Sequence, residues 1–146
     1  MKLIKTYKFF VGSETKFVDS VPEGSKDIAE NYWASLDNAC LFFLIFLAVV
    51  SIGVCAWYFT GYNELPGRHY RRSHWIGHYI GAAIISLLGT AALGYILTNP
   101  TVKGSGWLIW DIAFGNFIYA IIIFGVLSVI WWLFLPTNAY RLIGKR

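Results

Sequence analysis

The sequence predicts an all-α integral membrane protein with three transmembrane helices, preceded by a small extramembrane β-hairpin and an amphipathic helix. Of 146 residues, 57% are hydrophobic and 14% are charged, whereas about 25% of residues are charged in an average soluble domain. The stretches 38–63, 73–102 and 112–140 contain no Asp, Glu, Lys or Arg. Each exceeds the ~20 apolar residues that cross a bilayer. A chain this small could not bury three such segments in a soluble interior.

Residues 1–37 are expected to form an N-terminal extramembrane unit. The stretches "LIKTYKFFVG" and "TKFVDSV" are rich in aromatic and β-branched residues and flank Gly12-Ser13. This pattern predicts a hairpin with strands near 3–11 and 15–21. Because an isolated two-stranded hairpin is marginally stable in water, we expect it to dock on a partner. The candidate docking side chains are Tyr7, Phe9 and Phe17.

An amphipathic helix is predicted between the hairpin and the first span. Ser25 is a suitable N-cap for "KDIAENYWASLDNA", since its hydroxyl can accept from the free N–H groups of the first turn. Ile28, Tyr32 and Leu36 share one face of that helix. We therefore expect an interfacial helix that runs into the membrane.

The transmembrane domain is predicted over residues 38–136, with spans at about 39–60, 75–97 and 107–135. The second span should end before Pro100 and the third before Pro136, because proline cannot continue a helix and restricts the residue before it. Residues 137–146 then form a short basic tail. Tryptophan favours the headgroup level, so Trp75, Trp131 and Trp132 should mark one interface.

The distribution of basic residues predicts the orientation. With three spans, the 61–74 loop and the 137–146 tail share one side, which carries Arg68, Arg71 and Arg72 as well as the basic residues of the tail. Basic residues in short loops near span ends favour the cytoplasm. We therefore expect the N-terminus outside and the C-terminus inside, in a bacterial inner (plasma) membrane.

The three loop arginines are interpreted as contacts to a bilayer with anionic headgroups. Arg68, Arg71 and Arg72 precede the second span directly, where each can attract anionic lipid with about 1 kcal/mol. A nucleic-acid surface would need a longer basic stripe, so nucleic acid is not an expected partner. Trp75, Trp131 and Trp132 would lie at the same interface.

A metal site at the same loop is a weak alternative. His74 and His78 are four residues apart and share a helical face, and Glu64 and His69 are the nearest further ligands. A metal site needs three or four ligands in one place, which this spacing does not provide. We therefore expect no metal and no cofactor.

Two polar residues lie inside the third predicted span, Asp111 and Asn116. An intramembrane carboxylate is by default a functional candidate, but Asp111 lies one turn after Trp107, near the interface. Asn116 lies deeper and could form a hydrogen bond across helices. No nucleophile–base pair, phosphate loop or cofactor motif is recognisable, so an enzyme is not expected.

The second span is dense in small residues, which predicts close helix packing or oligomerisation. Gly77 and Gly81 form a GxxxG motif, and Ser86 and Gly89 continue the series of small residues. Such residues let helix backbones approach closely in lipid. Whether this face meets the same chain or another one is open at this stage.

Two functions remain. One is a non-catalytic polytopic membrane subunit that anchors or scaffolds a larger membrane-associated assembly. The other is a homo-oligomeric pore-forming or membrane-disrupting protein. The three spans, the expected N-out/C-in topology and the basic C-terminus are similar in architecture to one class of phage holins, which implies a self-assembled, channel-like effector. Because no span presents a continuous polar stripe that could line a lumen, the subunit reading is preferred.

Overall fold

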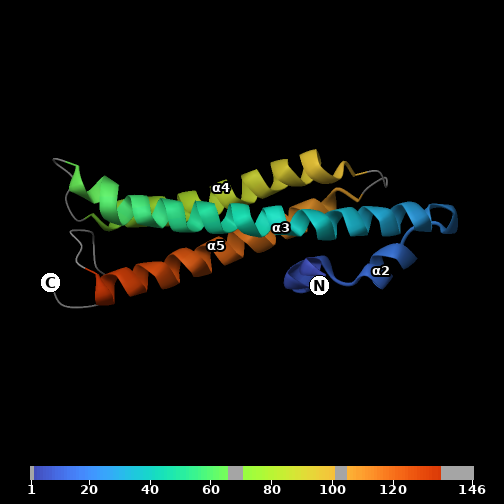
Figure 1. The fold of residues 1–146 in the computed structure, drawn as a ribbon, viewed down its shortest axis with the longest axis horizontal. Helices are drawn as coiled ribbons and strands as arrows, with labels where there is room; N and C mark the ends of the chain where they lie inside the picture. Colours follow the sequence, from blue (N-terminus) through green and yellow to red (C-terminus); the bar gives the residue numbers. More distant parts are fainter. Residues whose placement is uncertain (1, 66–70, 101–104, 136–146) are drawn as a thin grey trace.

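The computed structural model describes residues 2–65, 71–100 and 105–135. Three long helices dominate it: α3 (Lys26–Ala56), α4 (Arg72–Thr98) and α5 (Trp107–Phe134). Each pair of these helices is in contact, and they lie side by side along most of their length (Figure 1). All three are long and apolar enough to cross a membrane, by length and composition. The prediction of three helices long and apolar enough to span a membrane is confirmed.

α3 is longer than the span that the sequence predicts. It has 31 residues, which corresponds to about 46 Å of helix, so the predicted amphipathic helix and the first span are one continuous helix. After Ala56 the chain continues through a π-helical turn, η3 (Trp57–Gly61), and a 3₁₀ turn, η4 (Tyr62–Glu64). The expected boundary at residue 37 is therefore crossed without a break in the backbone.

The predicted N-terminal β-hairpin is wrong. The described part of the chain contains no strand, and the region folds as η1 (Leu3–Tyr7), α1 (Lys8–Val11), α2 (Glu14–Asp19) and η2 (Glu23–Ser25). The buried side chains Ile4, Tyr7 and Val11 recur at intervals of three and four, which is a helical spacing. Strand preference is strongly dependent on context, and here the aromatic residues pack against helices instead of a second strand.

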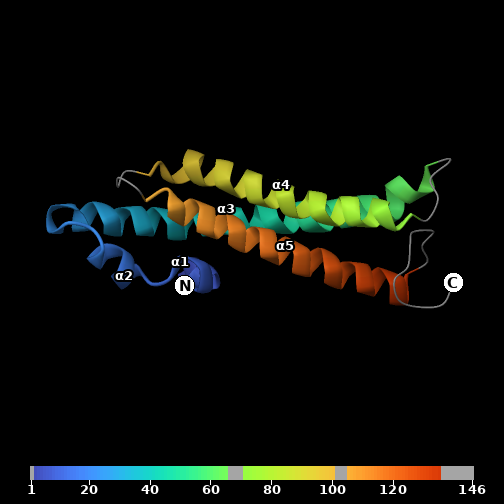
Figure 2. The ribbon, with the colours of Figure 1, turned by 180° about the vertical axis from the view of Figure 1, so that it is seen from behind.

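Residues 2–21, the N-terminal segment, fold back along the first half of α3 and the beginning of α5. Figures 1 and 2 show this arrangement from two sides, and η1, α1 and α2 contact these two helices. α1 and α2 are joined by a bend at Gly12, whose φ of 75° is costly for other residues, and the chain reverses direction after α2, where it enters α3 (Figure 1). Ser13 then accepts a hydrogen bond from the backbone N–H of Lys16 and caps α2.

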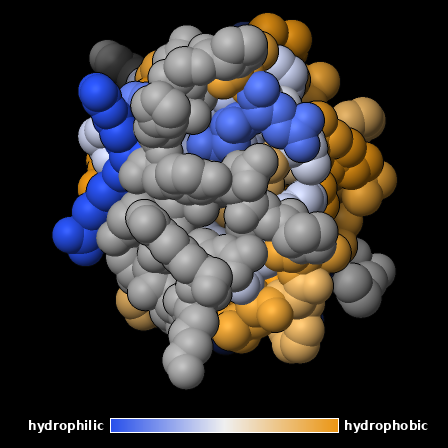
Figure 3. All heavy atoms as spheres, turned by 90° about the vertical axis from the view of Figure 1, so that its left-hand side faces the viewer, coloured by the Kyte–Doolittle hydropathy of each residue, from blue (hydrophilic) through white to orange (hydrophobic). Residues whose placement is uncertain are grey.

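The outer faces of α3, α4 and α5 are apolar. Large exposed hydrophobic side chains occur on all three helices, among them Phe42, Val49, Ile84, Leu88, Ile122 and Val126. Figure 3 views the end of the bundle at which α4 begins, and hydrophobic atoms form much of its rim. Such a surface is expected for helices that face lipid.

Candidate functional site

Asn116 joins the N-terminal segment to all three long helices. Its side chain is fully buried, and its Oδ1 accepts a hydrogen bond of 2.7 Å from the Tyr7 hydroxyl. Its Nδ2 donates to Thr90 Oγ1 at 2.8 Å and to the Phe43 carbonyl oxygen at 3.2 Å. We call these four residues the Asn116 network. In a medium without water, satisfying both ends of this amide favours one arrangement of the helices.

α5 also holds the N-terminal segment through a close approach at Gly115. A Cβ atom on Gly115 would lie 3.0 Å from ring carbons of both Tyr7 and Phe10, so the two rings occupy the space that a side chain would need. Farther along α5, the Tyr119 hydroxyl donates to the Thr6 carbonyl oxygen at 2.7 Å. The N-terminal segment is thus packed into the bundle.

The three predicted docking residues have different environments. Tyr7 and Phe17 are buried in the chain's own core, where Phe17 stacks on Trp33 with ring centroids 5.8 Å apart. Phe9 is 92% exposed. Of the three, only Phe9 therefore presents its ring to the surroundings.

The depth of the Asn116 network follows from the helix rise. At the opposite end of the bundle, Trp75 and Trp132 pack together with centroids 5.4 Å apart. The helix rises about 1.5 Å per residue, so the network lies about 22 Å from Trp75 along α4, at Thr90, and about 24 Å from Trp132 along α5, at Asn116. With the pair at one edge of a hydrocarbon core of about 30 Å, the network lies several ångströms inside the other edge. The N-terminal segment is then placed at that second interface.

The small residues of α4 fall into two sets. Ser86 is buried inside the bundle, and a Cβ on Gly89 would overlap the ring of Phe46. In contrast, a Cβ on Gly77 or Gly81 would meet no atom within 4 Å. We call Gly77 and Gly81 the glycine face, because the chain's own packing leaves them open.

The glycine face lies in a shallow groove of about 360 Å³ between α4 and the end of α3. Its lining comprises Val54, Tyr62, Ser73, His74, Gly77, His78, Gly81 and Ile85. The groove therefore combines an apolar floor with two imidazoles at its outer end.

The two histidines face tyrosines. The ring of His78 lies 4.6 Å from that of Tyr62 and 5.0 Å from that of Tyr58, and its Nδ1 is 2.8 Å from the His74 carbonyl oxygen. Within the described residues, no group of three or more His, Cys, Asp or Glu side chains could hold a metal ion. Glu64 ends η4 and is exposed, and His69 lies outside the described residues.

The predicted interface residues split between the surface and the helix contacts. Arg71 and Arg72 are exposed at the start of α4, and Arg68 lies outside the described residues. The indole N–H of Trp75 donates to Ser128 Oγ at 3.1 Å. Trp132 is buried and packs against Trp75. Trp131 stacks on Phe59 with centroids 5.2 Å apart. The three tryptophans therefore also join helices.

The two polar residues of the third span do not act together. Asp111 is half-buried, and five residues of helix turn it about 140° away from Asn116 around α5. The partners of Asn116 could not be found from local sequence patterns, since Tyr7 is 109 positions away. The one available signal is the presence of Thr90 and Asn116 within otherwise apolar stretches.

No protein-family model matches the chain, and no curated protein or solved structure is detectably similar to it.

Proposed function

We propose that the protein is a non-catalytic membrane subunit whose glycine face receives a transmembrane helix of a partner protein. In this role it anchors or scaffolds a larger membrane assembly. The observation that carries the proposal is the difference between the glycines of the spans. Gly89, Gly94 and Gly115 are covered by side chains of the chain itself, whereas Gly77 and Gly81 have nothing within 4 Å of a Cβ position and both line a groove.

The groove around the glycine face has the properties of a helix-packing site. Gly77 and Gly81 follow Trp75 by two and six residues of α4, which corresponds to about 3 and 9 Å of helix. With Trp75 at the membrane interface, both glycines lie at membrane depth. Without side chains, they allow a second backbone to approach closely, and the contact is then driven by van der Waals packing. Val54 and Ile85 provide apolar walls beside them.

The alternative, a homo-oligomeric pore, is less well supported by the arrangement of polar groups. A water-filled lumen would need polar side chains along the outer face of a helix. The amide of Asn116 and the hydroxyl of Thr90 instead hydrogen-bond to each other inside the bundle. The outer faces that copies of the chain would bring together are mainly apolar.

The mass of the complex extracted from membranes in mild detergent tests the proposal. The wild-type chain should be recovered with a second polypeptide, and Gly81→Leu should lose it because the new side chain fills the groove. Gly53→Leu is the matched control, since Gly53 is equally open but lies on α3 outside the groove. A wild-type homo-oligomer, or an unchanged complex in Gly81→Leu, would refute the subunit proposal.

A further inference from the structure

A pocket of about 290 Å³ lies between the N-terminal segment and α3. It is lined by Lys2, Ile4, Lys5, Lys8, Gly12, Ser13, Glu14 and Trp33. We call it the lysine pocket. A 3₁₀ helix has three residues per turn, so residues three apart lie above one another. η1 therefore aligns Lys2, Lys5 and Lys8 on one side and leaves Ile4 and Tyr7 to pack inward.

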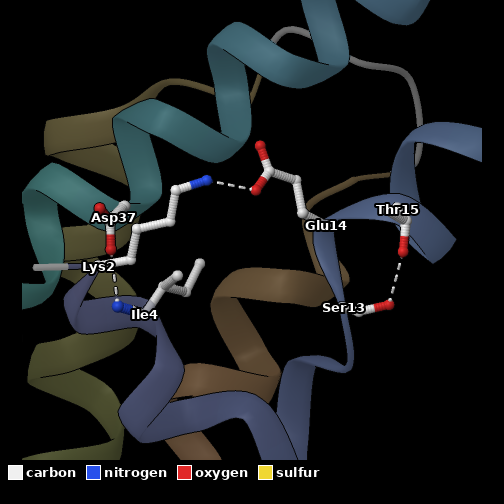
Figure 4. A network of polar contacts seen from close by, with 6 residues as sticks. All are labelled: Lys2, Ile4, Ser13, Glu14, Thr15 and Asp37. Atoms are coloured by element: carbon white, nitrogen blue, oxygen red, sulfur yellow. Dashed lines mark hydrogen bonds and ion pairs between the residues drawn. The ribbon is translucent and has the colours of Figure 1, made fainter.

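The positive charge of this pocket is only partly neutralised. Lys2 Nζ lies 2.6 Å from Glu14 Oε2, and this contact raises the pKa of Lys2 above its usual value. Asp37 Oδ1 accepts the backbone N–H of Ile4 at 2.7 Å. Figure 4 shows both contacts, with Lys2 reaching toward Glu14 and Asp37 pointing from α3 to the turn of η1. Lys5 and Lys8 are exposed and have no carboxylate partner within the described residues.

The pocket lies at the end of the bundle where α3 begins, and with the Trp75–Trp132 pair at one edge of the membrane it falls near the other edge. Its inner wall is apolar, since Ile4 and Trp33 are each only 3% exposed. The row of lysines extends from the level of Asp37, just before the apolar part of α3, toward the level of the Asn116 network. Phe9 follows Lys8 directly, and its ring is exposed, as expected for a side chain that meets acyl chains.

We propose that the lysine pocket binds the phosphate headgroup of an anionic phospholipid. Lys5 and Lys8 supply the two ammonium groups that contact the phosphate oxygens, and the Ser13 hydroxyl at the rim is a further donor. Phe9 contacts the glycerol backbone and the first methylene groups. The unpaired cations lie beside an apolar surface, and this combination favours a lipid over a dissolved anion. A dissolved anion has no acyl chains that could bury this apolar surface. This site is independent of the glycine face and lies at the opposite end of the bundle from Arg71 and Arg72.

The test is the binding of individual lipids to the purified full chain in detergent, measured by native mass spectrometry. Dioleoyl-phosphatidylglycerol should bind more tightly than dioleoyl-phosphatidylcholine. A lysine near a headgroup contributes about five-fold in affinity for an anionic lipid. Lys5→Gln and Lys8→Gln should each weaken phosphatidylglycerol binding by about that factor, and the double variant by about twenty-five-fold.

Two further variants separate specific binding from overall charge. Lys16→Gln with Lys26→Gln removes the same charge from the same end of the bundle but leaves the pocket intact, and should keep the wild-type preference. Lys5→Arg with Lys8→Arg retains the charge and should keep most of the affinity.

The proposal is overturned if the Lys5 and Lys8 glutamine variants retain the wild-type preference, or if the Lys16/Lys26 control loses it equally. Displacement of phosphatidylglycerol by inorganic phosphate or by a short polyglutamate peptide would also overturn it, because the pocket would then accept an anion without its acyl chains.

Discussion

The Tyr7 hydroxyl donates a hydrogen bond of 2.7 Å to Asn116 Oδ1, across 109 positions of the sequence. This bond attaches the N-terminal segment to the bundle of α3, α4 and α5. Asn116 also binds Thr90 and the Phe43 carbonyl, so the N-terminal segment and the three spans share one polar centre. We therefore regard the N-terminal segment as a structural element of the fold, and the contact that we propose to a partner lies at the glycine face instead.

Removing the Tyr7 hydroxyl should destabilise the fold by a measurable amount. Tyr7→Phe keeps the ring but leaves Asn116 Oδ1 without its donor, and hydrogen bonds between membrane helices contribute about 0.6 kcal/mol, with a maximum near 1.7. We expect the free energy of unfolding to fall by about 1 kcal/mol, measured by circular dichroism during an SDS titration. Tyr95→Phe, at an exposed position, should leave it unchanged. Equal stability of Tyr7→Phe and the wild type would show that the bond contributes nothing.

A methyl group on Gly115 should weaken the attachment of the N-terminal segment. In Gly115→Ala the new Cβ would lie 3.0 Å from the rings of Tyr7 and Phe10, and overpacking of this kind costs about 1–3 kcal/mol. We expect trypsin to cleave after Lys5 and Lys8 faster than in the wild type. Gly125→Ala on the same helix is the control, because its Cβ would meet Tyr79 at an ordinary 3.8 Å. Similar cleavage rates in the two variants would contradict the close approach at Gly115.

The orientation in the membrane is a prediction from the basic residues, among them Arg71 and Arg72 at the start of α4. A cysteine introduced at Ser13 should react with an impermeant thiol reagent applied to intact cells, and one at Ser73 should not. The native Cys40 and Cys55 are buried, so the background labelling should be low. Reaction at Ser73 without reaction at Ser13 would reverse the assignment.

The three spans could be predicted because composition alone determines them. Stretches of more than 20 residues without a formal charge have few alternatives to crossing a bilayer, and Pro100 limits the end of the second span. The sequence groups Gly77, Gly81, Ser86 and Gly89 as one series of small residues, but this series does not predict which of them pack inside the bundle. Ser86 lies about 140° around the helix from Gly81, and only the tertiary structure shows which of the small residues face another helix.

The N-terminal segment could not be predicted from strand preference. Its aromatic and β-branched residues resemble those of a strand, but the lysines at positions 2, 5 and 8 have a spacing of three, which is helical. That signal is short, and the burial that stabilises the segment comes from α3 and α5. Short helices of this kind are unstable alone, so their structure depends on contacts that no local pattern contains.

The central claim is that the N-terminal segment is built into the bundle through Asn116, and backbone amide hydrogen exchange tests it most directly. The full-length protein in lipid nanodiscs would be compared with Asn116→Leu, which removes the partner of Tyr7. We predict that amides of residues 3–11 are protected in the wild type and lose most of this protection in Asn116→Leu, while the amides of α4 remain protected in both. Rapid exchange of residues 3–11 in the wild-type protein would contradict the claim.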